Sequence, residues 1–146
     1  MAATAWALWN KAKKAIGNGT IQLGVNVLKM QLHTSAAVGF TTNSAISTAA
    51  SVTGEVAAGN GYATGGQALA TVVWTVGASA GQYKLGAANP VWTGTGGSIA
   101  NIKFALIKNS AGKAVCWSKL TTAQFTLTIN NTLTVQFAAA GVFTLA

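Results

Sequence analysis

The sequence has almost no acidic side chains. Of its 146 residues one is Glu, none is Asp, and all nine basic residues are Lys, which leaves a net charge of +8. General acid–base pairs, glycosidase dyads and Ser-His-Asp triads all need carboxylates beside other titratable groups. Metal sites need several oxygen anions, or about three or four His, Cys or carboxylate ligands. The inventory here is Glu55, His33 and Cys116, so the composition predicts a protein that is not an enzyme and holds no metal, cofactor or small-molecule substrate.

Charge of either sign is scarce. Charged residues make up 7% of the chain and hydrophobic residues 51%, against about 25% charged residues in ordinary soluble domains. Nine lysines cannot cover the outside of such a chain, so Ala, Gly, Thr, Ser and Asn must form most of its surface. Surfaces with few charges promote association. The sequence therefore predicts a subunit of a larger assembly that also binds copies of itself, as a dimer or a trimer.

The positive charge favours an acidic partner, which could be nucleic acid, anionic lipid or an acidic protein lattice. The alternative is that the charge serves solubility alone. Proteins that read nucleic-acid sequence usually do so with Arg, whose planar guanidinium contacts bases and phosphates bidentately. Because every cation here is Lys, the sequence disfavours a nucleic-acid partner.

A second cysteine, the features of a signal peptide and long apolar runs are also missing. Cys116 is the one cysteine, which excludes an intramolecular disulfide, and its neighbours Val115 and Trp117 indicate a strand and a structural thiol. Residues 1–5 lack the basic and apolar regions of a signal peptide. No run of about 18 apolar residues is present, so we expect a soluble chain with no membrane span.

One segment, residues 5–16, has the pattern of a helix. Ala5, Trp9, Ala12 and Ile16 recur at helical spacing, with Thr4 as the expected N-cap and residues 17–19 as the end. A short basic helix with tryptophans could lie on a membrane. Packing on its own domain or on a neighbour is favoured, since short helices depend on tertiary contacts.

This helix supplies the candidate partner-contact residues. Two large aromatic side chains lie next to a cationic rim, which is the composition of an interface hot spot. The candidates are Trp6, Trp9, Lys11, Lys13 and Lys14.

After the helix the hydrophobic period changes to two. Along residues 27–33, alternation points Leu28, Met30 and Leu32 inward and turns His33 to the polar face. We expect no catalytic or metal role for His33, because no second ligand or carboxylate is near it in the pattern.

Residues 34–67 are rich in Gly, Ala, Ser and Thr and lack strand alternation. Residues 44–57 could be helical around Glu55, and residues 58–66 resemble an ordered loop whose glycines permit positive φ. No Gly-Lys-Ser/Thr follows, so this is not a phosphate loop. The candidate architectural residues are Gly61, Tyr62, Gly65 and Gly66.

From residue 68 onward the sequence predicts β-structure. About seven or eight short strands with turns between them favour an antiparallel β-sandwich or jelly roll. The clearest expected hairpin joins residues 125–129 to 133–137 around Asn130 and Asn131. The expected fold is mainly β, a single domain over 1–146 with a short N-terminal α-helix and its cap (1–19), then a sandwich (20–146) containing the loop region 34–67.

The order of these features resembles small virion structural proteins of tailed bacteriophages over nearly the whole chain. The similar elements are the helix end at 14–19, the strand at 27–32, Glu55-Val56 ahead of the glycine loop, Val91-Trp92-Thr93 and the ending at 125–145. The segment Gly-Tyr-x-x-Gly-Gly-x-x-Leu at 61–69 is the most specific of them.

The resemblance implies a capsid cement (decoration) protein that binds junctions between copies of the major capsid protein. Its location would be the virion capsid, assembled in the host cytoplasm. Two alternatives stay open: a tail or head–neck component, and a cationic module that binds nucleic acid or an anionic surface.

Overall fold

The computed structural model describes residues 5–41 and 45–146. The chain is mainly β, with antiparallel sheets and one short α-helix, as the sequence predicts. Within these two ranges no helix has the length and apolar character needed to cross a membrane.

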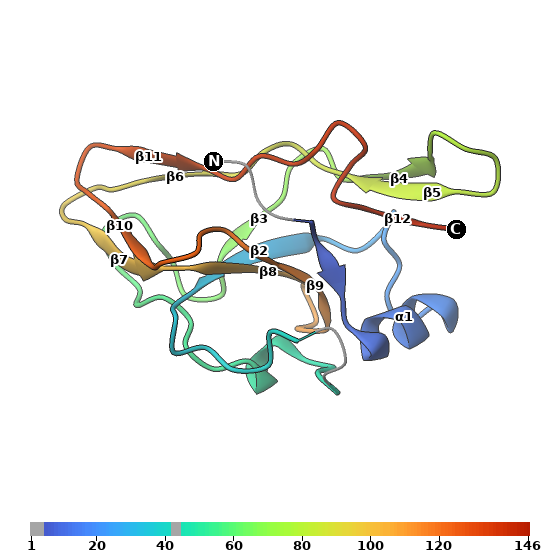
Figure 1. Cartoon of the computed structure of the whole chain (residues 1–146), viewed down its shortest axis with the longest axis horizontal. Coiled ribbons are helices and arrows are strands. Elements are labelled where there is room, and N and C mark those ends of the chain that lie inside the picture. Colours follow the sequence, from blue (N-terminus) through green and yellow to red (C-terminus); the bar gives the residue numbers. More distant parts are fainter. Residues whose placement is uncertain (1–4, 42–44) are drawn as a thin grey trace.

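A five-stranded antiparallel sheet forms the lower layer in Figure 1. Its strands, in spatial order, are β1 (Ala7–Leu8), β9 (Ala114–Lys119), β8 (Phe104–Asn109), β2 (Leu28–His33) and β3 (Gln67–Ala68). Strands β8 and β9 are joined by a tight turn in which the Gly112 N–H donates to the Asn109 carbonyl. Among the sheets, this one carries the largest share of the buried side chains.

The remaining strands extend the β8–β9 hairpin, at the end away from its turn, into a long ribbon of paired strands. They are β4 (Val73–Val76), β5 (Tyr83–Gly86), β6 (Val91–Thr93), β7 (Ile99–Ile102), β10 (Phe125–Leu127), β11 (Thr132–Thr134) and β12 (Phe143–Leu145). Strand β7 pairs with β10, β6 with β11, and β5 with β12, all antiparallel, while β4 pairs with the outer side of β5. The arms 83–109 and 114–145 therefore form one hairpin of nested pairs.

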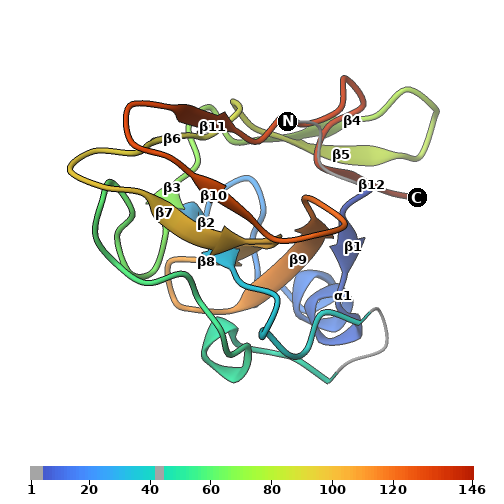
Figure 2. The same ribbon diagram turned by 60° about the vertical axis from the view of Figure 1, so that its left-hand side comes forward.

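The hairpin bends back over the sheet from which it starts. Figure 1 shows β4, β5, β6, β11 and β12 above the five-stranded sheet, with β7 and β10 at one end between the two layers. Figure 2 shows from another side how the ribbon passes from β8 and β9 through β7 and β10 to β6 and β11. A jelly roll would also pair β12 with β7 and β11 with β8; neither pairing is present among the described strands, and β2 occupies that edge of β8. The jelly-roll arrangement is thus not confirmed.

The expected hairpin around Asn130 and Asn131 is wrong. Strands β10 and β11 follow one another in the same arm and pair with β7 and β6 of the opposite arm. The turn itself exists, with Asn130 at φ 65°, but it is a corner and not a reversal. Gly94 on the opposite arm bends beside it, donating to the Asn131 carbonyl and accepting from the Asn130 N–H. Sequence alternation located both strands and the turn, but it carried no information about their partners.

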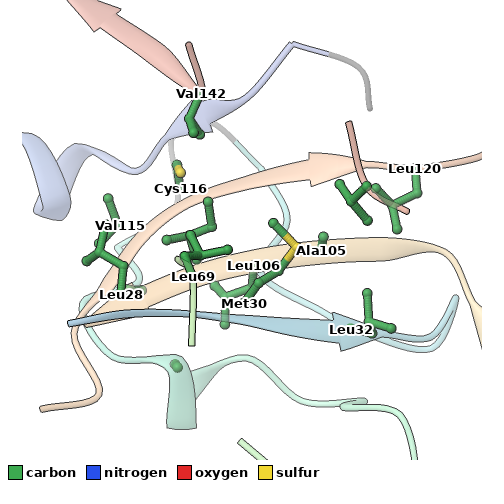
Figure 3. Packing of buried hydrophobic residues seen from close by; sticks show 14 of the residues in the cluster. Leu28, Met30, Leu32, Leu69, Ala105, Leu106, Val115, Cys116, Leu120 and Val142 are labelled. Atoms are coloured by element: carbon green, nitrogen blue, oxygen red, sulfur yellow. The ribbon is translucent and has the colours of Figure 1, made fainter. Parts of the chain in front are cut away.

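The core fills the space between the two layers. Leu28, Met30 and Leu32 of β2 are completely buried, as their alternation predicts. Figure 3 shows them together with Leu69 and Val142, which come from outside the central strands.

The opposite face of β2 is buried as well, and the expectation that His33 lies on a polar outer face is wrong. His33 is 1% exposed and Gln31 5% exposed, because residues 34–41 and 45–57, here called the covering segment, run across that face (Figure 1). The covering segment is bonded to β2 at the Leu32 carbonyl, which accepts from the Val56 N–H at 2.9 Å. Both faces of β2 therefore face protein.

The expected helix over residues 44–57 is also absent from the part of that range that the structure describes, which begins at residue 45. One 3₁₀ turn, η1 (Ala49–Ser51), is present instead. The covering segment uses its backbone groups in two ways: the Ala49 N–H donates to the Gly112 carbonyl of the β8–β9 turn, and the Thr34 N–H donates to the Gly54 carbonyl within the segment. These bonds hold an irregular path where a helix would satisfy the groups internally.

The N-terminal helix is shorter than expected. Helix α1 spans Asn10–Gly17, with Trp9 at its N-cap, whereas residues 7 and 8 form β1 on the edge of β9. The free edge of β9 offers backbone partners to an extended segment, and this overrides the weak helical pattern there. The expected N-cap, Thr4, lies outside the described residues.

Trp9 anchors this region to the rest of the chain. Its side chain is fully buried, its Nε1–H donates to the Gly39 carbonyl at 2.9 Å, and its ring lies 6.2 Å from Phe40. Ala12, one turn further on, is buried too. Trp9 therefore joins the helix to the covering segment.

We predict that Trp9→Ala lowers the free energy of unfolding by about 3–5 kcal/mol, because it empties a large buried volume and removes the bond to Gly39. Trp6→Ala is the matched control: Trp6 is only half-buried, so its loss should cost clearly less. Urea denaturation followed by fluorescence measures both. Equal stabilities of the two variants would contradict the anchor role.

Candidate functional site

The glycine loop (residues 58–66) has the architectural character that the sequence predicts. Gly61, Gly65 and Gly66 all have positive φ, at 97°, 88° and 74°. A Cβ on Gly66 would overlap the Met30 carbonyl oxygen, and one on Gly61 would overlap the carbonyl oxygen of Thr93. The loop therefore lies directly against backbone of β2 and β6, where no side chain fits.

The single carboxylate of the chain holds this loop in place. Glu55 Oε1 accepts hydrogen bonds from the Tyr62 hydroxyl at 2.8 Å and from the Gly65 N–H at 2.6 Å. The Tyr62 oxygen in turn accepts from the Leu32 N–H of β2 at 3.1 Å. One chain of hydrogen bonds thus links the covering segment, the glycine loop and the central sheet.

Tyr62 is 3% exposed. Burial raises the pKa of Tyr62 well above its usual value, and the hydrogen bond to Glu55 adds to the rise, while the bond from the Leu32 backbone opposes it. The hydroxyl therefore stays protonated and donates to the carboxylate. Sequence analysis selected Tyr62 but missed its partner Glu55; the available signal was a lone carboxylate just ahead of a loop whose backbone N–H groups need an acceptor.

His33 lies beside this network under the covering segment. Its Nδ1 is 3.2 Å from the Thr53 carbonyl oxygen, and its ring contacts Phe40 edge-on at 5.3 Å. Its Nε2 is buried without a hydrogen-bond partner. Burial lowers the pKa of His33; the Thr53 carbonyl and the Glu55 carboxylate oppose this, and the Lys108 charge adds to it. The imidazole is therefore a neutral part of the interior.

Cys116 is fully buried in β9, which confirms the expected structural thiol. Burial raises the pKa of Cys116, so the nucleophilic thiolate is disfavoured. In the described ranges no three His, Cys, Asp or Glu side chains gather in a way that could hold a metal ion.

A pocket of about 580 Å³ opens next to the Glu55 network. Gln31 and Lys108 from the central sheet line it, together with η1, the glycine loop and the β8–β9 turn. Its polar groups are a carboxylate, an ammonium group, an amide and threonine hydroxyls, so its chemistry is that of polar recognition.

The candidate partner-contact residues of the N-terminal helix differ in whether a partner could reach them. Lys11, Lys13 and Lys14 are exposed and Trp6 is half-buried, so all four stay accessible. Trp9 is not accessible, and its assignment as a partner contact is wrong, because its ring is enclosed by the chain's own core.

An exposed apolar area that sequence analysis missed lies at the end of the upper layer. We call Val25, Trp74, Val76 and Tyr83 the overhang patch. Trp74 stacks on Tyr83 at 5.8 Å, and with Val25 it lines an open groove of about 330 Å³. Val25, Val76 and Tyr83 are 77%, 59% and 47% exposed. In Figure 1 this end of β4 and β5 extends beyond the sheet, above α1.

No family model, curated protein or solved structure shows significant similarity to the chain.

The glycine loop generates one prediction. Gly66→Ala should destabilise the fold more than Gly65→Ala, because the Gly66 Cβ would overlap the Met30 carbonyl whereas that of Gly65 meets only the end of the Lys108 side chain. For Gly65→Val we expect a loss of about 1–3 kcal/mol from the positive φ. Thermal melts of the three variants measure the order. If Gly66→Ala melts at the wild-type temperature, the loop is not held against β2.

His33 generates a pH prediction. Above about pH 6.5 the imidazole is neutral in both the folded and the unfolded chain, so it contributes no pH dependence. As the pH falls below 6.5, the unfolded chain takes up a proton that the folded chain disfavours. The free energy of unfolding should therefore fall, by at most about 1.4 kcal/mol per pH unit.

The near absence of carboxylates makes this titration easy to assign, since the chain has one acidic side chain. His33→Phe retains an aromatic ring against Phe40 and cannot take up a proton. Urea denaturation between pH 7 and pH 5 should show a slope for the wild type and none for His33→Phe. An equal slope in both would assign the effect to another group.

Proposed function

We propose that the chain is a non-enzymatic structural subunit of a bacteriophage particle, a capsid cement protein that binds the major capsid protein and copies of itself. The observation that carries the proposal is the overhang patch. It is an exposed apolar surface in a chain with a net charge of +8, and exposed apolar patches of this kind mark protein–protein contacts.

The geometry of β4 supports association at this patch. Strand β4 is the edge of its sheet, and no described strand pairs with its outer side. Because the Gly77 N–H donates to the Gln82 carbonyl, antiparallel alternation directs the backbone groups of Trp74 and Val76 away from β5. An edge with free backbone groups and no charged side chain is a template for pairing with another strand. A second copy of the chain offers a matching edge.

The placement of the titratable groups supports a structural role. The Glu55 carboxylate accepts two hydrogen bonds from the glycine-loop region, and His33 and Cys116 are enclosed in the interior. Each therefore contributes to the architecture. We also propose that the nested hairpin is a partly rolled form of a jelly-roll sandwich, since its four pairs follow the order in which a jelly roll nests its strands.

A cement protein would act by mass action. A protein that binds the assembled lattice and not its free subunits stabilises the lattice, by about 2.7 kcal/mol per site at a hundredfold excess over Kd. Exposed Lys11, Lys13 and Lys14 suit an acidic shell surface. Purified particles should contain the chain at a fixed copy number relative to the major shell protein, measured by mass spectrometry; its absence from particles would refute the cement role.

We predict that the isolated protein self-associates and that Val76→Lys abolishes this, because the new charge lies in the middle of the apolar contact. Val38→Lys is the matched control: Val38 is 58% exposed, close to the 59% of Val76, but it lies on the covering segment. Sedimentation velocity at high micromolar concentration should show an oligomer for the wild type and the control and a monomer for Val76→Lys. A monomeric wild type would count against association through β4.

A further inference from the structure

The pocket beside Glu55 contains polar groups that the fold does not use. Gln31 is 5% exposed and lines the pocket, yet its Oε1 is buried without a hydrogen-bond donor. A buried acceptor without a donor is destabilising relative to a satisfied one. A ligand that offers an N–H group to this oxygen, once the Gln31 side chain turns toward the pocket, would remove that penalty.

Lys108 supplies an unneutralised cation to the same pocket. It lines the pocket together with Glu55, but no ion pair joins the two side chains in the described part of the chain. The Lys108 Nζ reaches toward the glycine loop, since a Cβ added to Gly65 would lie 3.8 Å from it. An anion that enters the pocket can therefore reach this ammonium group.

A second lysine increases the positive charge. Lys29 is the cross-strand partner of Lys108, so both side chains leave the sheet on the same face. Like charges directly opposite one another destabilise a sheet, and an anion bound next to them would relieve the repulsion. The two lysines and Glu55 sum to a local charge of about +1, which matches one singly charged anion.

We propose that this pocket binds a carboxylate of an acidic polypeptide, with Lys108 contacting the carboxylate and the Gln31 side chain turning its Oε1 toward the pocket to accept a neighbouring N–H. The volume of about 580 Å³ lies in the usual range for ligand sites. A second copy of this chain cannot supply the carboxylate from a side chain, because its one acidic residue, Glu55, already forms part of the site. An acidic side chain in this pocket must therefore come from a different protein. This inference deepens the proposed function by naming the group on the partner that is recognised.

The test uses three short peptides and isotope-labelled full-length protein. The first peptide is blocked at both ends and contains a central glutamate; the second carries glutamine in its place. The third is a blocked-N-terminus glycine tripeptide with a free terminal carboxylate. Amide NMR titration should show saturable shifts at Gln31, Gly65 and Gly112 with the first or the third peptide and none with the second. The relative response to the first and third peptides distinguishes an acidic side chain from a chain terminus.

Two variants make the result specific. Lys108→Gln should weaken binding at least tenfold, whereas Lys84→Gln, which removes a half-buried lysine on the ribbon strand β5, should leave it unchanged. Equal binding of the glutamate and glutamine peptides, no binding of either carboxylate peptide, or equal losses in the two lysine variants would each overturn the proposal. Sedimentation of Lys108→Gln keeps the two ideas apart, because self-association at the overhang patch should persist whatever the pocket binds.

Discussion

The hydrogen bonds to Glu55 Oε1 are the interaction on which the second face of the central sheet depends. A carboxylate that accepts from a buried tyrosine and from a backbone N–H gains from both bonds, since charge-assisted bonds are stronger than neutral ones. The Tyr62 hydroxyl, which donates to Glu55, also accepts from the Leu32 N–H, so the network extends to β2. Through these contacts the covering segment is held against β2, and both faces of that strand become interior.

A chain with so few charged side chains must keep its apolar side chains away from water by other means, and its architecture does so by covering the central sheet. Covering the second face of β2 also buries Ala49, Val52 and Val56 of the covering segment, and removing apolar area from water is the dominant favourable term in folding. The ribbon above the sheet buries one face and leaves its outer edge, β4, unpaired. Exposed Val25, Val76 and Tyr83 lie together in the overhang patch, while the three lysines of α1 lie exposed on another element.

Interior polar groups distinguish the covered face of β2 from the core between the layers. His33 and Gln31 alternate with Leu28, Met30 and Leu32 along β2, so the strand has an apolar face and a polar face that are both buried. The polar face is packed against irregular backbone, whose carbonyl groups can accept bonds, as Thr53 does for His33. The same arrangement leaves Gln31 Oε1 at the wall of a pocket without a donor.

The amino-acid sequence alone determined the β class, the positions of most strands, the buried alternation of β2 and the positive-φ role of the glycine loop, because these follow from short-range patterns of two to six residues. Which strands pair was decided by tertiary structure: the turn at Asn130 became a corner because β6 and β7 offered partners. The burial of His33 and Trp9, and the meeting of Glu55 with Tyr62, likewise required the covering segment to cross the sheet. Alternation states which side chains share a face, but only packing against distant segments decides whether that face meets water.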